Sequence, residues 1–222
     1  MKIVACYSNK GGVGKTAASV NLAYAFAKAG KRVLLCDLDP QGASGFYFRV
    51  KPSEKLENEA FFEDVKQFTK AIRGSDYDNL EILPANMTFR DFDVFLSRMK
   101  NSRSRLKKSL KAVGGDYDVI VLDCPPNISM LSENVLQASD LIVVPVIPTT
   151  LSERTFEQLL DFVGGRTGRR TPPARSGSWP SSRWCSARSC CMARRWSGCG
   201  TPIPSRCCRP CCPFPPTSSG WA

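Results

Sequence analysis

The chain has 222 residues, enough to bury the core of one domain, and it carries 31 Lys and Arg against 20 Asp and Glu. Its formal net charge is +11, and the absence of His excludes catalysis and metal binding by imidazole. No run of 18 apolar residues occurs, so the sequence predicts no membrane-spanning helix.

The first predicted element is a strand that leads into a Gly-rich turn. Apolar residues 3–7 precede Lys10-Gly11-Gly12-Val13-Gly14-Lys15-Thr16, and an Ala-rich segment follows. Glycines let successive backbone N–H groups point at a polyphosphate, and the next helix adds partial positive charge at its N-terminus. In such a loop Lys15 reaches the β- and γ-phosphates, and the Thr16 hydroxyl binds Mg²⁺. The predicted nucleotide-binding residues are Lys10, Gly11, Gly12, Val13, Gly14, Lys15, Thr16 and Ala17.

A second predicted strand, residues 31–36, ends at two carboxylates. The segment Asp37-Leu38-Asp39-Pro40-Gln41-Gly42 follows it directly. In open α/β sheets ligands bind beyond the carboxyl ends of the strands, so Asp37 and Asp39 are candidate site residues. Carboxylates at a strand end can also cap a helix or form a turn, and that alternative stays open.

The middle of the chain predicts two helices on either side of a third strand. The helices cover residues 61–72 and 89–113, and the strand covers residues 80–85. The second helix carries a basic stripe that consists of Arg98, Lys100, Arg103, Arg105, Lys107, Lys108 and Lys111. Such a stripe can face DNA or a partner protein, or it can be a solvated surface.

A further predicted strand, residues 118–123, ends in a Walker-B-type carboxylate. Asp123 stands at its carboxyl end, where it would hold the Mg²⁺ shell through water. The turn Cys124-Pro125-Pro126 follows it.

The last predicted strand, residues 141–146, precedes a helix. Thr150 and Glu153 have the spacing of a capping box at the start of that helix. One face of the helix is apolar and consists of Phe156, Leu159, Leu160 and Val163.

In this order the motifs resemble those of the ParA/Soj/MinD family of deviant Walker-A P-loop ATPases, closest to the ParA-type partitioning ATPases. The resemblance covers residues 1 to about 163 and includes a departure from the general P-loop, because Asn9 stands where Gly is usual and Lys10 is a second lysine. It implies an α/β fold with a doubly wound, mostly parallel sheet and flanking helices. It also implies ATP and Mg²⁺ as cofactors.

The resemblance further implies residue roles. Lys10 would cross to the nucleotide of a partner subunit, Lys15 would contact phosphate, and Asp39 would position the attacking water. Asp37 would lie near the metal, which Thr16 and Asp123 would hold. The segment after Cys124 would be a second switch loop.

The function implied by the resemblance is an ATP-hydrolysing dimeric switch in chromosome or plasmid partitioning. Such a protein would be cytoplasmic, bind non-specific DNA on the nucleoid and respond to a ParB-like stimulating partner. The alternatives are a MinD-like or cargo-positioning ATPase, an inactive truncated fragment, and a metal-cluster carrier or reductase related to the nitrogenase iron protein.

Residues 166–222 differ sharply from residues 1–165. This tail has ten Arg, no Lys, Asp or Glu, all four Trp and eight of the eleven Cys, whereas residues 1–165 hold 21 basic and 20 acidic side chains. Arg and Trp could bind nucleic acid, and Cys207–Cys212 could hold zinc or an iron–sulfur centre. A disulfide scaffold is a third alternative.

A fourth interpretation of the tail is translation out of frame. Arg, Pro, Ser, Cys, Trp and Gly without Lys or acids are typical of a GC-rich gene in the wrong frame, and a shift by one nucleotide can recode residues 191–205 as a charged helix. We therefore interpret residues 1–165 as an incomplete P-loop ATPase domain and residues 166–222 as a disordered, out-of-frame tail. On this interpretation we expect weak or no ATP hydrolysis by the chain.

Overall fold

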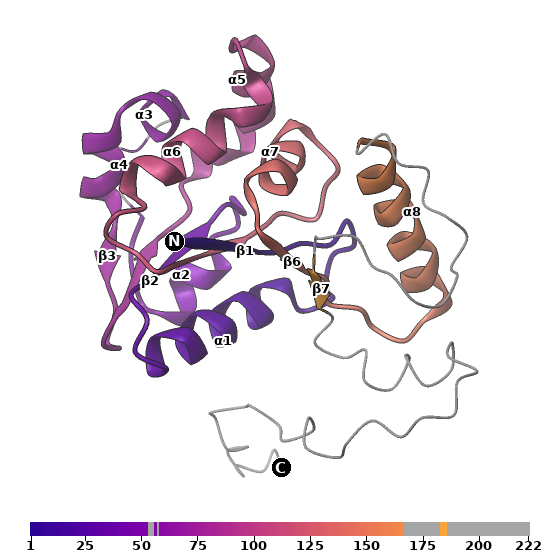
Figure 1. Cartoon of the computed structure of the whole chain (residues 1–222), viewed down its shortest axis with the longest axis horizontal. Coiled ribbons are helices and arrows are strands. Elements are labelled where there is room, and N and C mark those ends of the chain that lie inside the picture. The colour runs from indigo at the N-terminus through magenta and orange to yellow at the C-terminus, as the bar shows by residue number, and fades with distance from the viewer. Residues whose placement is uncertain (53–55, 57, 167–182, 186–222) are drawn as a thin grey trace, which may run out of the picture.

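The computed structural model describes residues 1–52, 56, 58–166 and 183–185. Its centre is a seven-stranded sheet with the order β3-β4-β2-β5-β1-β6-β7 (Figure 1). The strands are β1 (Lys2–Cys6), β2 (Val33–Asp37), β3 (Arg73–Gly74), β4 (Leu80–Leu83), β5 (Val119–Asp123), β6 (Leu141–Val143) and β7 (Arg183–Cys185). All neighbours pair in parallel except β3 and β4, which are antiparallel. The predicted α/β fold with a mostly parallel sheet is confirmed.

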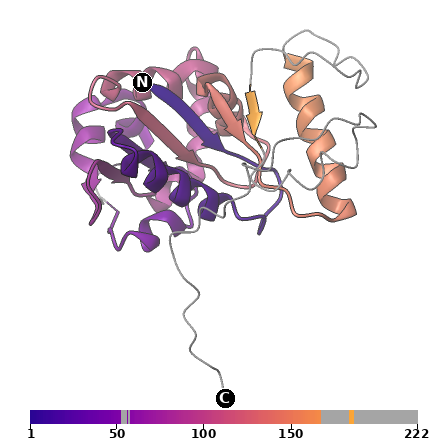
Figure 2. The same ribbon diagram turned by 60° about the horizontal axis from the view of Figure 1, so that its bottom comes forward.

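Helices cover both faces of the sheet (Figures 1 and 2). The α-helices are α1 (Lys15–Lys28), α2 (Ala43–Tyr47), α3 (Asn58–Glu63), α4 (Val65–Ala71), α5 (Phe92–Arg98), α6 (Arg105–Val113), α7 (Met130–Ala138) and α8 (Thr150–Arg166). Two 3₁₀ helices, η1 (Met87–Asp91) and η2 (Ser102–Ser104), flank α5. No helix in the described ranges is both long and apolar enough to cross a membrane.

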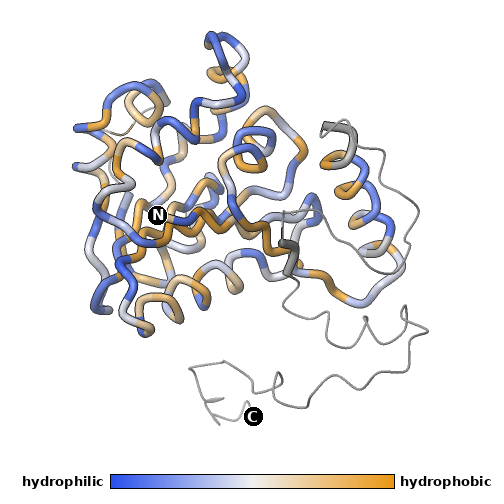
Figure 3. The backbone as a smooth tube through the Cα atoms, in the orientation of Figure 1, coloured by the Kyte–Doolittle hydropathy of each residue, from blue (hydrophilic) through white to orange (hydrophobic). Residues whose placement is uncertain are grey.

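The central strands are apolar on both faces because each face has its own core. In β1, Ile3 and Ala5 pack into one hydrophobic cluster, while Val4 and Cys6 pack into the other. The second cluster includes Val20 of α1, so α1 covers that face of the sheet. Figure 3 shows the hydrophobic strands enclosed between more polar helix surfaces. Burial on both sides explains why these strands have continuous apolar sequences instead of alternating ones.

The two long helices predicted for the middle of the chain are wrong as continuous elements. The first predicted helix is broken at Asp64. The Asp64 carboxylate accepts hydrogen bonds from the backbone N–H groups of Lys66, at 2.9 Å, and Gln67, at 3.1 Å. Asp64 therefore caps α4. The second is interrupted after α5, where Met99 is extended and Asn101 has φ = 56°, a left-handed conformation that Asn tolerates.

Aromatic packing accompanies these breaks. The ring of Phe92 lies 4.3 Å from that of Phe89 and 4.9 Å from that of Phe61, measured between centroids. Phe89 and Phe92 are three residues apart, and η1 leads directly into α5, so both rings lie on one helical face. Both rings contact Phe61 of α3, and the break in the predicted helix lies beyond them, at Met99 and Asn101.

The segment that leads into α8 also differs in detail from its prediction. β6 ends at Val143, earlier than the predicted residue 146, because Pro145 has no N–H for the ladder. The backbone N–H of Ser152 donates to Thr149 Oγ1 at 3.3 Å, so Thr149 caps α8 in place of the predicted Thr150. Of the predicted apolar face of α8, Leu159 is fully buried in the core, and Phe156 and Val163 pack against it while partly buried.

A short piece of the tail joins the sheet. Residues Arg183–Cys185 form β7, which pairs in parallel with β6. The rest of the tail, including Cys207–Cys212, lies outside the described residues, so its predicted disorder and its alternative metal or nucleic-acid roles stay untested.

Candidate nucleotide-binding site

The loop between β1 and α1 has the backbone of a phosphate-binding turn. Gly12 has φ = 69° and Gly14 has φ = 89°, left-handed values that favour glycine. A Cβ atom placed on Gly11, Gly12 or Gly14 would meet no heavy atom within 4 Å, so open space borders the loop. No side chain of the described residues caps α1, and the first turn of this helix contains no acidic residue. The N–H groups at this helix end are therefore available to an anion.

Lys15, at the start of α1, is a buried cation. Its side chain bends back so that Nζ donates to the backbone oxygen of Lys10 at 3.0 Å. Burial lowers the pKa of Lys15, while the negative charges of Asp123 and Asp39 oppose that effect. A desolvated ammonium group at the Gly-rich loop is suited to bind phosphate, which would replace the carbonyl as its partner.

The predicted Walker-B carboxylate lies beside the first predicted switch carboxylate. Asp123 and Asp37 are direct register partners at the carboxyl ends of β5 and β2. Both oxygens of Asp123 are buried, and neither has a hydrogen-bond partner in the part of the chain that the structure describes. Burial first, and then the charge of Asp37, raise the pKa of Asp123 to about 7; the nearby hydroxyls of Thr16 and Ser19 partly offset this. Two unpaired buried oxygens at the P-loop suit a divalent cation.

Asp37, in contrast, already has hydrogen-bond donors on both carboxylate oxygens. The Asp39 backbone N–H donates to Oδ1 at 3.1 Å, and Ser44 donates to Oδ2 through its N–H at 3.1 Å and its hydroxyl at 2.6 Å. Burial raises the pKa of Asp37 to about 6, although these hydrogen bonds favour the ionised form. In this geometry Asp37 fixes the loop between β2 and α2. Its predicted place near a metal stays a prediction.

Asp39 lies in the loop beyond β2, as expected. Its Oδ1 accepts a hydrogen bond from the Gln41 backbone N–H at 3.0 Å, and the loop turns at Gly42, which has φ = 65°. Among the described residues, no hydrogen bond is made to the second oxygen of this carboxylate, which leaves it available to a bound group. The negative charge of Asp39 opposes the lowering of the Lys15 pKa, so Asp39 lies within electrostatic range of that ammonium group.

Lys10 contacts the start of α8 within the same chain. Its Nζ donates to Ser152 Oγ at 3.0 Å and lies 3.5 Å from Thr149 Oγ1. The P-loop packs against α8 so closely that the cavity between them is only about 10 Å³. The predicted role of Lys10 in a partner subunit would require this contact to open.

The loop after β5 is anchored to β1 by a side chain that sequence patterns do not identify. The hydroxyl of the buried Tyr7 donates to the backbone oxygen of Asn127 at 2.8 Å. Burial raises the pKa of the neighbouring Cys124 thiol, which makes it an apolar packing group. The sequence also does not identify Ser44 and Ser152 as the partners of Asp37 and Lys10. A single serine near the start of a helix is common and belongs to no functional motif.

The donor set fits a cation that is bound together with phosphate. Among the described residues, no group of three or more His, Cys, Asp or Glu side chains could hold a metal ion alone. Mg²⁺ usually takes one or two carboxylates and completes its shell with water and substrate phosphates. Thr16 and Asp123, next to the open space along the P-loop, match that requirement.

The parallel sheet, the left-handed glycines and the buried Lys15 define a P-loop nucleotide-binding protein. Residues 1–168 match a protein family described as an AAA domain. The chain belongs to this family and, within it, to the ParA-type P-loop ATPases.

Individual relatives agree with this assignment. Over 164 residues, the chain is 38% identical to the sporulation initiation inhibitor protein Soj of Bacillus subtilis, covering 73% of this chain and 64% of Soj. It is 34% identical to the chromosome partitioning protein ParA of Myxococcus xanthus, covering 64% of this chain and 51% of ParA.

The fold also resembles that of a solved structure with nucleotide. Cobyrinic acid a,c-diamide synthase from Mycobacterium smegmatis, with bound ADP and magnesium, aligns with a TM-score of 0.69 and 31% identity, covering 76% of this chain and 69% of that one. The matched part of this chain spans 64% of the length of Soj and 51% of the length of ParA.

Proposed function

We propose that this chain is an ATP-binding and ATP-hydrolysing switch of the ParA type that works as a dimer. The observation that carries the proposal is the buried, unpartnered carboxylate of Asp123, which couples to the buried ammonium group of Lys15 beside the Gly-rich loop. A buried anion without a partner is costly, and a Mg²⁺ ion with its bound water would relieve that cost. The names of the relatives agree with nucleotide binding and with partitioning.

The proposed role of each residue follows from its position in the nucleotide site. Lys15 and the N–H groups of the loop would bind the β- and γ-phosphates and stabilise the charge that develops as the bond between them breaks. Thr16 and Asp123 would hold Mg²⁺, which neutralises phosphate charge when bound. Asp39 would orient the attacking water through the carboxylate oxygen that the Gln41 N–H does not use.

Lys10 would complete the site of a partner subunit after leaving Ser152 and Thr149. ATP would favour the dimer and hydrolysis would release it, with residues 37–44 and 124–129 as the moving loops. In a cell we propose a cytoplasmic role on the nucleoid, with non-specific DNA and a ParB-like stimulating protein as partners.

The first test is binding of a fluorescent ATP analogue to the full chain, with and without Mg²⁺. We expect Mg²⁺ to strengthen binding and Lys15→Ala to weaken it by roughly 30- to 150-fold, because a charged phosphate contact is worth about 2–3 kcal/mol. The control is Lys31→Ala, an exposed lysine before β2, which should bind like the parent chain. Equal binding by all three proteins would overturn the proposal.

Hydrolysis and DNA binding test the finer statements. We expect slow ATP turnover by this chain, and binding to duplex DNA that requires ATP and weakens with salt. Nucleotide binding with no turnover at any protein concentration would support an inactive fragment. DNA binding that ignores ATP would contradict a nucleotide-controlled switch.

A further inference from the structure

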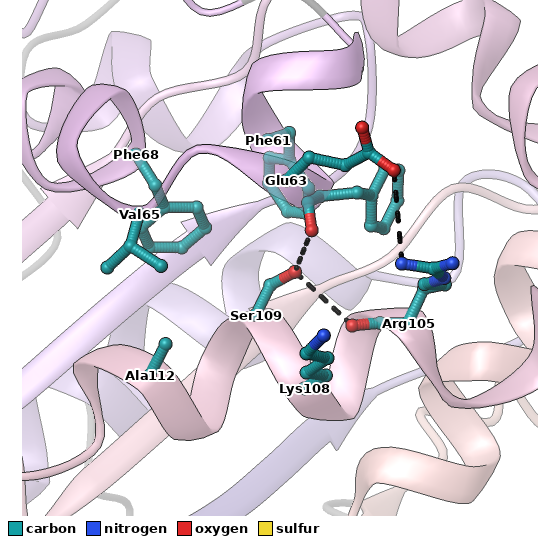
Figure 4. Close-up of a pocket in the computed structure, with 9 residues that line it drawn as sticks. Phe61, Glu63, Val65, Phe68, Arg105, Lys108, Ser109 and Ala112 are labelled. Carbon is teal, nitrogen blue, oxygen red and sulfur yellow. Dashed lines mark hydrogen bonds and ion pairs between the residues drawn. The ribbon is translucent and has the colours of Figure 1, made fainter.

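A second pocket lies away from the nucleotide site. It has a volume of about 230 Å³ and opens between α3, α4 and α6. These three helices lie on the side of the molecule opposite α8 (Figures 1 and 2). In Figure 4, Phe61, Val65 and Phe68 line one side of the pocket, and Arg105, Lys108 and Ala112 of α6 line the other.

One wall of this α3–α4–α6 pocket is apolar and closely packed. Phe61 and Phe68 are each 1% exposed, and their ring centroids lie 5.2 Å apart. Phe61 also packs on Phe89, at a centroid distance of 5.3 Å. Val65, at the rim, is 46% exposed, a large value for an apolar side chain. A surface with a fixed aromatic floor and an exposed valine is suited to receive an apolar side chain.

The other wall is basic. α6 contains no acidic residue, and its outer face carries Arg105 and Lys108 beside the pocket. Glu63 is the acidic residue that lines the pocket, and its carboxylate lies 3.9 Å from the Arg105 guanidinium. An ion pair this long between partly exposed groups contributes little, so a competing carboxylate could take its place. Lys108 has no hydrogen bond or ion pair with the residues that the structure describes.

Size and charge limit the occupant. The volume suits one or two side chains and is below the range of about 300–1,000 Å³ that is usual for small-molecule pockets. The chain's own tail, with ten Arg and no acid, would be repelled by the basic rim. A DNA backbone would satisfy the charges but has no apolar group for the floor between Phe61 and Phe68.

We propose that this pocket docks an acidic segment of a partner protein, which inserts one large apolar side chain between α3, α4 and α6. Carboxylates on either side of that side chain pair with Arg105 and Lys108. The apolar anchor gives affinity, and the charges give orientation and a faster association rate. This interaction surface does not depend on ATP hydrolysis, so its test is separate from that of the nucleotide site.

The probe is a fluorescently labelled peptide, Asp-Glu-Glu-Phe-Glu-Asp-Glu, with two companions in which Leu or Ala replaces Phe. Binding to the full 222-residue chain is followed by fluorescence anisotropy. Two variants alter different walls: Ala112→Trp fills the pocket from an exposed position, and Lys108→Glu reverses the charge of the rim. Lys31→Glu is the matched control, because it makes the same charge change at a distant exposed site.

We expect the Phe and Leu peptides to bind and the Ala peptide to bind about tenfold more weakly. Ala112→Trp and Lys108→Glu should each weaken binding of the Phe peptide by about five- to tenfold, and Lys31→Glu by less than about twofold. Equal binding of all peptides, equal effects of Lys108→Glu and Lys31→Glu, or no binding at about 1 mM peptide would overturn the proposal. Duplex DNA binding that is lost in Lys108→Glu and retained in Ala112→Trp would instead indicate a nucleic-acid surface.

Discussion

Lys10 Nζ lies 3.0 Å from Ser152 Oγ, so the P-loop is tied to the first turn of α8 within one chain. A cation at a helix N-terminus opposes the helix dipole, which makes this contact weak. The contact therefore holds Lys10 in place without preventing its release. It also links any movement of α8 to the residue proposed to serve the partner's nucleotide.

Ser152→Ala should release Lys10. The hydrogen bond from the Lys10 ammonium group to the hydroxyl of Ser152 is worth about 1 kcal/mol. Without it, we expect Lys10 to react with an amine-modifying reagent up to about fivefold faster. Mass spectrometry of the modified chain measures the rate for each lysine. Lys31 serves as an internal standard and should react at the same rate in both proteins. An unchanged Lys10 rate would mean that Thr149 or loop packing holds it instead.

The stability of the nucleotide-free protein should fall as the pH rises from about 4 to about 7. The folded-state pKa of Asp123 is about 7 and that of Asp37 about 6, both above the usual 3.8, so the folded state binds more protons than the unfolded state across that window. The loss should reach a few kcal/mol and level off above pH 7. Urea unfolding at a series of pH values measures it.

Two variants check the cause of that pH dependence. Asp123→Asn should remove the slope between about pH 6 and 7 and reduce it below pH 6, because Asp37, whose pKa is raised by its own burial, still titrates there. Asp116→Asn, at an exposed position, should leave the slope unchanged. Stability that rises with pH through this window would contradict the buried pair as its origin.

Ser44→Ala should loosen the loop after β2. The Ser44 hydroxyl donates to Asp37 Oδ2 at 2.6 Å in a fully buried environment, so its loss leaves a carboxylate oxygen one donor short. We expect unfolding to become easier by about 1–3 kcal/mol, with the larger effect above pH 6, where Asp37 is ionised. Ser139→Ala removes a hydroxyl that, within the described residues, bonds only to the Val135 carbonyl, and it should cost less than about 1 kcal/mol.

Phe61→Ala should destabilise the fold by about 3–5 kcal/mol, because Phe61 is 1% exposed and joins the aromatic side chains of α3, α4, η1 and α5. Val65→Ala, at the exposed rim nearby, should change stability by less than about 0.5 kcal/mol. Denaturant midpoints of the two variants give the comparison. A small effect for Phe61→Ala would show that the cluster repacks around the cavity.

The contiguous parts of the site could be read from the sequence alone. The P-loop from Lys10 to Ala17 is one uninterrupted segment whose glycines, lysine and threonine each have a local chemical reason. Asp37 and Asp123 could also be placed, because both end apolar strands of a parallel sheet and such strand ends meet at one edge. Local pattern and sheet geometry are enough where a residue's role depends on its own strand or turn.

Only the tertiary structure decided the rest. The partners of Asp37, Lys10 and Tyr7 come from loops and helix starts whose side chains follow no period. The break of the segment 89–113 lies at Met99 and Asn101, where no Gly or Pro marks it in the sequence. The basic side chains of α6 could be recognised as a stripe, but not the pocket beside them. Contacts between distant segments have individual energies of about 1 kcal/mol and depend on the whole packing arrangement, so no local pattern in the chain records them.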